Sequence, residues 1–123
     1  MVNLSDYRVN VGVEESTETI VNAIKEFGPF DGVASFSQGS AIFRAFMFYT
    51  HVINPEPYKY LQFPKFVISF GGGVFKDILL KLDGKYYSTA SDFKCRIDSM
   101  HIYGTKDVFF DKCEMEPSLY LPG

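Results

Sequence analysis

The apolar positions of this chain switch between helical spacing and the short continuous runs that are typical of buried strands. Two segments carry an apolar stripe at helical spacing and are predicted as helices, one over 14–27 and one from the residues after Gly39 to about His51. Three short apolar runs are predicted as buried parallel strands, at 33–36, 66–70 and 99–103. Strands that alternate with helices imply βαβ units, so the predicted fold class is α/β, a parallel sheet flanked by helices.

The segments between these elements carry weaker patterns. Residues 1–12 are polar and weakly patterned, and 54–64 holds three prolines and is predicted as a loop. Residues 74–82 are predicted as a helical turn or a short helix. The stretch 83–98 is polar and ambiguous, and the tail 114–123 holds two prolines and no clear pattern. The sequence therefore predicts three strands and two helices, and leaves the rest open.

The junction between the first predicted strand and the second predicted helix carries the strongest chemical signal. It reads Ser35-Phe36-Ser37-Gln38-Gly39, which fits the small-x-Ser-x-small pattern of a hydrolase nucleophile elbow. In such a turn the serine hydroxyl stands above the sheet, and the next backbone N–H, here that of Gln38, faces the same space as an oxyanion donor. Gly39 fits the trailing small position, whereas Ser35 stands where glycine is more usual. We therefore predict Ser37 as a catalytic nucleophile.

A second interpretation of Ser37 remains open at this stage. Serine is a good N-cap, so Ser37 could simply cap the second helix. In that case the chain would be a flavodoxin-like binding domain without hydrolase chemistry.

The triplet Gly71–Gly73 could suggest a phosphate cradle, but it lacks the downstream lysine of a P-loop and the spacing of a dinucleotide fingerprint.

Composition narrows the possible classes of protein. The chain has 123 residues, which suits one domain, 1–123, with 46% hydrophobic and 22% charged residues. Its net charge of −3 argues against nucleic-acid binding and against a polybasic membrane patch. It has no apolar run of about 18 residues, so no integral membrane segment is expected. The 13 Phe and 8 Tyr supply a bulky core or an apolar surface for a partner.

Cysteine and histidine usage predicts neither a disulfide nor a metal site. Cys95 and Cys113 form no C-x-x-C pair, and the two histidines are not spaced with them as a zinc site requires. The N-terminus lacks the apolar stretch of a signal peptide, so we expect reduced thiols and a cytoplasmic location. No cofactor is expected.

Two motifs together resemble one enzyme family. The segments Gly28–Val33 and Phe36–Gly39 are similar to the signature GPFDGxxGFSQGA of the FSH family of serine hydrolases. The segment Ser99–Asp107 resembles the strand and turn that deliver the catalytic aspartate in that family. The resemblance implies a partial α/β-hydrolase fold and hydrolysis of a small-molecule acyl ester or thioester. It implies Ser37 as nucleophile and Asp107 as the acid that orients a histidine; Asp111 is a weaker alternative.

The chain departs from the family pattern at both ends. Family members begin with a strand and a His-Gly loop that supplies a second oxyanion donor, and their triad histidine follows the acid; neither feature occurs here. His51 lies at the far end of a helix about 20 Å long, and His101 lies within the strand before Asp107, so neither is expected to be the base.

We therefore expect a domain truncated at both ends, with little or no hydrolase activity of its own. The alternative function is a catalytically incompetent remnant that binds a partner or an acyl ligand. Exposed sheet edges would then favour self-association.

Overall fold

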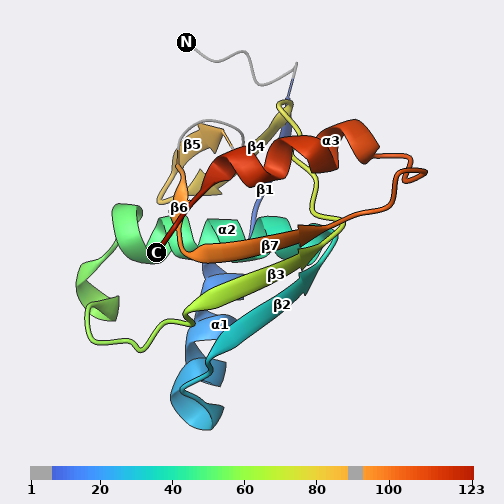
Figure 1. Cartoon of the computed structure of the whole chain (residues 1–123). Helices are drawn as coiled ribbons and strands as arrows, with labels where there is room; N and C mark the ends of the chain where they lie inside the picture. Colours follow the sequence, from blue (N-terminus) through green and yellow to red (C-terminus); the bar gives the residue numbers. More distant parts are fainter. Residues whose placement is uncertain (1–6, 89–92) are drawn as a thin grey trace.

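The computed structural model describes residues 7–88 and 93–123, and its main sheet has three parallel strands. These are β2 (Gly32–Phe36), β3 (Phe66–Phe70) and β7 (Asp98–Ile102), in the order β2-β3-β7. Their carboxyl ends lie together at one edge, as the arrowheads in Figure 1 show. All three strands were predicted from their apolar runs, and the predicted α/β class is confirmed.

The two predicted helices are also confirmed. α1 (Val13–Phe27) buries a stripe at helical spacing and ends at Gly28, whose N–H donates to the Ile24 carbonyl oxygen at 2.9 Å. α2 (Gln38–Phe48) packs against α1 and continues into a π-helical turn, η2 (Tyr49–Ile53). A single 3₁₀ turn, η3 (Glu56–Tyr58), lies in the loop that was predicted from its prolines. The last turns of α2 provide much of the core, with the side chains of Phe43, Phe46, Met47 and Phe48 buried.

A second, smaller sheet was missed. It has the order β1-β4-β5, with β1 (Arg8–Asn10) parallel to β4 (Ile78–Leu82) and β4 antiparallel to β5 (Lys85–Ser88). The predicted helical turn or short helix over 74–82 is therefore wrong across the length of β4. The missed signal is the Asp83-Gly84 pair, whose φ angles of 50° and 75° form the turn of a β-hairpin.

The C-terminal tail is also ordered, although it carries no clear sequence pattern. α3 (Phe110–Met115) leads directly into the 3₁₀ helix η4 (Glu116–Leu119), and then into β8 (Tyr120–Leu121), which pairs in parallel with β6 (Cys95–Arg96). Figure 1 shows this segment crossing the molecule from the carboxyl edge of the main sheet back toward β6. It thereby brings Glu116 into the interior.

The main sheet has two different faces. Side chains that alternate along the strands point to one face at Val33, Ser35, Val67, Ser69, Ser99 and His101, which α2 and η4 help to cover. The opposite face carries Ala34, Phe36, Phe66, Ile68, Phe70, Met100 and Ile102. We call these the covered face and the apolar outer face. In the part of the chain that the structure describes, no helix is long and apolar enough to span a membrane.

Candidate active site

Ser37 occupies a strained turn between β2 and α2. Its φ and ψ angles are 54° and −119°, a region that residues other than glycine rarely adopt. Such a conformation costs on the order of 1–3 kcal/mol and persists only where its surroundings impose it. Here the Ser37 N–H donates to the Phe70 carbonyl oxygen at 2.8 Å, and the Ser37 carbonyl oxygen accepts the Ser40 N–H at 3.0 Å. The turn is thus held to the neighbouring strand and to the helix, while Ser37 itself is exposed.

The residue after Ser37 is the first of α2, so this site lies at a helix N-terminus. The first backbone N–H groups of a helix have no partner within it, and the helix dipole adds a partial positive charge there. Gln38 is therefore placed where its N–H could serve a developing oxyanion. The side chain of Ser37 makes no capping hydrogen bond to this helix. Ser37 is thus the N-cap residue of α2 by position, but its hydroxyl group does not cap the helix.

The space around Gly39 is more open than the elbow pattern predicts. The pattern implies that a small residue is needed there for close approach of the backbone. A Cβ added at Gly39 would meet no described atom within 4 Å, apart from the helix's own backbone and the adjacent residues. Packing therefore does not require glycine at this position.

Ser35, the other departure from the usual elbow, has a specific partner. Its Oγ lies 2.8 Å from Ser40 Oγ, which lies 2.7 Å from Ser69 Oγ on the neighbouring strand. All three hydroxyl groups are buried. A buried hydroxyl needs a hydrogen-bond partner, so the serine in place of glycine is accommodated by a second serine in the first turn of α2.

Asp107 lies in the loop after β7, at the same edge of the sheet as Ser37. Its Oδ1 accepts the Phe109 N–H at 2.8 Å, and its own N–H donates to the Gly104 carbonyl oxygen at 3.1 Å. Asp107 Oδ2 would lie 3.8 Å from a Cβ built on Gly71. Gly71 directly follows Phe70, whose carbonyl oxygen accepts the Ser37 N–H. The structure therefore brings the Ser37 turn and the Asp107 carboxylate close to the same short segment, Phe70–Gly71. The weaker alternative, Asp111, is exposed on α3.

A cavity of about 290 Å³ opens beside Ser37. Gln38 and Gly71 also line it, and its wall is mixed in character. Apolar groups come from Ala41, Phe75, Ile78 and Phe109, and polar groups from Arg8, Asn10 and Arg44. A volume near 300 Å³ is at the lower end of small-molecule sites. The cavity therefore has the size for a small ligand beside the serine.

Both histidines make hydrogen bonds away from this cavity. His51 Nδ1 lies 2.9 Å from the Met47 carbonyl oxygen and 3.1 Å from Thr50 Oγ1, in the π turn beyond α2. His101 Nδ1 lies 2.8 Å from Glu116 Oε1, and its Nε2 lies 2.9 Å from Ser99 Oγ. Neither histidine lines the cavity. His51 is exposed at the end of the helical segment, and His101 is half-buried within β7, as the sequence led us to expect.

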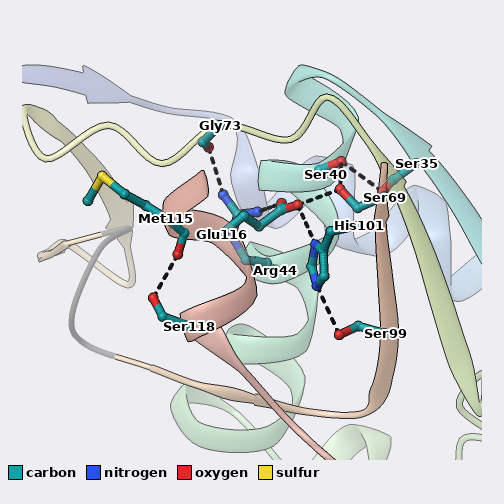
Figure 2. A network of polar contacts seen from close by, with 10 residues as sticks. All are labelled: Ser35, Ser40, Arg44, Ser69, Gly73, Ser99, His101, Met115, Glu116 and Ser118. Atoms are coloured by element: carbon teal, nitrogen blue, oxygen red, sulfur yellow. Dashed lines mark hydrogen bonds and ion pairs between the residues drawn. The ribbon is translucent and has the colours of Figure 1, made fainter. Parts of the chain in front are cut away.

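Glu116 is the centre of a buried polar network that sequence reasoning missed (Figure 2). Its side chain is 1% exposed, forms an ion pair with Arg44 and accepts the Ser69 hydroxyl at 2.6 Å. Because a carboxylate only accepts hydrogen bonds, Ser69 must donate to it, Ser40 must donate to Ser69, and Ser35 must donate to Ser40. The chain of hydroxyl groups therefore has one direction, toward the carboxylate.

The network connects the C-terminal tail to the wall of the cavity. Arg44 lines the cavity, pairs with Glu116 and also donates to the Gly73 carbonyl oxygen at 3.1 Å. Gly72 must be small, because a Cβ there would lie 2.2 Å from Glu116 Oε2. Neither a motif nor a hydrophobic period marked Glu116. The only available hint was a charged residue beside Pro117 in an otherwise featureless tail.

The two cysteines are free and buried. Burial raises the pKa of Cys95 to about 12, with nearby Arg44 opposing the shift. Burial also raises the pKa of Cys113, and the charges of Asp107 and Glu116 add to that shift. Both thiols are therefore poor nucleophiles at neutral pH, unlike an activated catalytic cysteine.

An exposed serine in a strained strand-to-helix turn, at the carboxyl edge of a parallel sheet, is the arrangement of the α/β-hydrolase class. A family model described as "Serine hydrolase (FSH1)" matches residues 3–120. The chain therefore belongs to this family of serine hydrolases, and the resemblance stated from its motifs is confirmed. No solved structure shows significant similarity to it.

Three relatives illustrate the match and its extent. Esterase C25G4.2 of Caenorhabditis elegans is 33% identical over 101 residues, 80% of this chain and 40% of that protein. Esterase OVCA2 of Bos taurus is 52% identical over 31 residues, 25% of this chain and 14% of that protein. A Schizosaccharomyces pombe protein named dihydrofolate reductase is 33% identical over 123 residues, 89% of this chain and 24% of that protein. The matched segments thus cover 40% or less of the length of each relative.

Proposed function

We propose that this chain carries the nucleophile and the acid of a serine esterase that acts on a small acyl ester or thioester. The observation that carries the proposal is the strained, exposed conformation of Ser37 between β2 and the N-terminus of α2. Membership of the serine hydrolase family and the two relatives named esterases support it. The reductase name is not transferred, because the family model that covers most of the chain is a hydrolase model.

In this proposal each residue has a separate role. The Ser37 hydroxyl attacks the substrate carbonyl and forms the tetrahedral intermediate, while the Gln38 N–H donates to its oxyanion. Asp107 orients the imidazole that takes the serine proton and later returns it to the leaving group. Both histidines of the chain make other hydrogen bonds, so this base would come from outside these 123 residues. The chain alone should therefore react slowly, since loss of a triad member costs several powers of ten in rate.

A fluorophosphonate probe tests the nucleophile directly. We expect slow labelling at Ser37, located by mass spectrometry, and complete loss of that labelling in Ser37→Ala. Ser118→Ala is the matched control, since Ser118 is an exposed serine far from the elbow in sequence. Added imidazole should speed labelling if only the base is missing. Labelling that survives Ser37→Ala would contradict the nucleophile assignment, and labelling as fast as that of a complete hydrolase would contradict the missing base.

A second candidate function is binding of an acyl ligand without turnover. The hydrogen bonds that occupy both histidines favour it, together with a cavity beside Ser37 that needs no chemistry to hold a ligand. The Ser37→Ala chain discriminates the two. Under this candidate, it should bind a short-chain fatty acid in calorimetry as well as the unmodified chain does, and neither should be labelled even with imidazole present.

A reducing, cytoplasmic environment is proposed from the thiols. Cys95 and Cys113 are both free and buried, a state that a reducing compartment maintains. Fractionation of cells that express a tagged chain would test it, and recovery in an oxidising compartment would contradict it.

A further inference from the structure

Three side chains on the covered face form a connected relay that the esterase proposal does not use. Ser99 Oγ lies 2.9 Å from His101 Nε2, and His101 Nδ1 lies 2.8 Å from Glu116 Oε1. Figure 2 shows the three side chains joined in this order by dashed contacts. A hydroxyl group, an imidazole and a carboxylate at hydrogen-bond distance are the components of a catalytic triad, which is defined by its geometry and not by positions in the sequence.

The hydrogen bonds of this relay have one direction. The Glu116 carboxylate can only accept, so His101 Nδ1 carries a proton and donates to Glu116. In a neutral imidazole the other nitrogen is then an acceptor, so the Ser99 hydroxyl donates to His101 Nε2. Arg44 already pairs with Glu116, so the carboxylate has a countercharge even when the imidazole is neutral. His101 is therefore placed to remove the Ser99 proton.

The fold holds the imidazole in place and leaves the serine accessible. Ser99 and His101 are two residues apart in β7, so their side chains point to the same face of the sheet. The ring of Tyr120 packs against the imidazole, with 4.9 Å between the ring centroids. Glu116 is buried, His101 is half-buried and Ser99 is exposed. The relay thus runs from a buried acid through a packed base to an exposed hydroxyl group, as a nucleophilic site requires.

An open cleft of about 380 Å³ lies beside Ser99. Its other walls come from the residues at the start of β7 and from the C-terminal tail: Ile97, Asp98, Tyr120, Leu121 and Pro122. None of these residues lines the cavity beside Ser37, so the two serines face different spaces. A cleft of this volume admits a short acyl group.

We propose that Ser99, His101 and Glu116 form a second nucleophilic site, at which an activated acyl donor, a thioester or an aryl ester, acylates Ser99. Ser99 Oγ attacks the acyl carbonyl, His101 Nε2 takes the hydroxyl proton, and the bond from the acyl carbon to the leaving sulfur or oxygen breaks. The proton then passes from His101 to the leaving group, so the products are an ester on Ser99 and a free thiol or phenol. Glu116 is a positioning residue that holds the imidazole. The proposal goes beyond the esterase function and does not depend on it.

The position of Ser99 within a strand determines which donors can react. Ser37 precedes a helix, whose first N–H groups can stabilise an oxyanion, whereas Ser99 lies inside β7. Without that stabilisation the barrier to attack is higher, so a good leaving group must compensate for it. Hydrolysis of the acylated serine should be slow for the same reason. The acyl group should therefore remain on Ser99 long enough to be detected.

Acetylation by p-nitrophenyl acetate tests the proposal in the full chain carrying Ser37→Ala, so failure of the esterase function does not affect the result. Trypsin leaves Ser99 in residues 97–106 and Ser118 in residues 113–123, so mass spectrometry follows the two serines separately, and fragment spectra distinguish Ser99 from Tyr103. Ser118 is the matched control, because it is exposed but its hydroxyl donates to the Met115 carbonyl oxygen and not to an imidazole. We expect acetylation at least about tenfold faster at Ser99 than at Ser118, since a general base contributes about 10²–10⁴-fold. Equal rates at the two serines would overturn the proposal.

Two variants test the roles of the other residues, with circular dichroism to show whether each one folds. His101→Ala should lower acetylation of Ser99 to the rate of Ser118, and added imidazole should restore it at Ser99 more than at Ser118. Glu116→Gln should lower the rate at Ser99 and leave the rate at Ser118 unchanged. Fast acetylation of Ser99 in a folded His101→Ala chain, or a loss that imidazole does not restore, would overturn the assignment of His101 as the base. An unchanged rate in Glu116→Gln would overturn the positioning role of Glu116.

Discussion

On the β2-β3-β7 sheet, the covered face carries many of the polar groups and the outer face is apolar, which reverses the usual arrangement. The covered face carries Ser35, Ser69 and His101, and it receives the charged groups of Arg44 and Glu116 from the elements that pack on it. The outer face carries phenylalanine, isoleucine and methionine side chains that remain exposed. Polar groups are thus buried where apolar groups would be expected, and apolar groups are exposed.

This difference shows how each face is specified. A buried polar group is tolerated only when its partners are in place, so the covered face accepts one arrangement of α2 and the C-terminal tail. Glu116 enforces that arrangement, because it must meet Arg44, Ser69 and His101 at once. The outer face has no such partners and specifies only that something apolar should cover it. Substitutions on the covered face should therefore destabilise the fold more than substitutions on the apolar outer face.

The largest effect is expected when one charge is removed from the covered face. Glu116→Ala leaves Arg44 buried without its partner, and breaking a buried ion pair in this way costs about 3–5 kcal/mol of unfolding free energy. Met100→Ala removes a side chain of similar length from the outer face and should change stability by less than about 0.5 kcal/mol, as an exposed position does. Urea unfolding monitored by circular dichroism, at a concentration below any self-association, measures both.

Glu114→Ala provides the local control for Glu116→Ala. Glu114 lies two residues earlier, in the same helical segment, and is exposed. Its replacement should leave the unfolding midpoint nearly unchanged. Similar losses in Glu116→Ala and Met100→Ala would show that the two faces do not differ in the way described.

A smaller loss is expected when the covered face is overfilled. In Gly72→Ala the new methyl group would overlap the Glu116 carboxylate, which has no free space because it is buried and bonded on both oxygens. Overpacking of this kind costs about 1–3 kcal/mol. The measurement is again the free energy of unfolding. A neutral result would mean that the carboxylate can move aside, and that the network is less tightly specified than its hydrogen bonds indicate.

Much of the carboxyl edge of the main sheet could be predicted from the sequence, because local patterns encode its strands and the turn at Ser37. The apolar runs of β2, β3 and β7 have the length of buried strands, and the change to helical spacing after Ser37 marks the turn. The order of strand, serine turn and helix then follows from the chain itself. Parallel strands bring their carboxyl ends to one edge, so Asp107 was expected there as well.

The missed features depend on contacts between residues far apart in the sequence. Glu116 is buried because Arg44, 72 positions away, needs a partner, and no local pattern records that need. β4 pairs with β1 70 positions earlier. Its other partner, β5, is local, and there the Asp83-Gly84 turn was a signal in the sequence that the prediction did not use. From the sequence, open sheet edges and partly exposed Phe and Tyr side chains were expected, but not where they would lie. The structure places exposed apolar side chains across one whole face of the main sheet.

The effects of replacing Ser35 and Ser40, two members of the buried hydroxyl chain, on the free energy of unfolding should be modestly coupled. Ser40→Ala breaks both of its links and should cost about 1–2 kcal/mol, whereas Ser35→Ala breaks one and should cost less. Their double variant should cost less than the sum by about 0.5–1 kcal/mol, because the link between the two hydroxyl groups can be lost only once. A double-mutant cycle from urea unfolding measures the difference. Strict additivity would mean that the two hydroxyl groups are not coupled.

The smallest effect, and the one of opposite sign, is expected at the elbow itself. Gly39 lies in the first turn of α2, has open space where a Cβ would stand and is exposed. Alanine favours helix over glycine by up to about 1 kcal/mol, so Gly39→Ala should stabilise the chain slightly. Fluorophosphonate labelling of Ser37 should be measured on the same variant. If stability rises while labelling falls, the glycine serves the approach of the substrate to Ser37. If stability falls, strand and helix are packed more closely at this turn than the structure shows, and the packing argument for a small residue is restored.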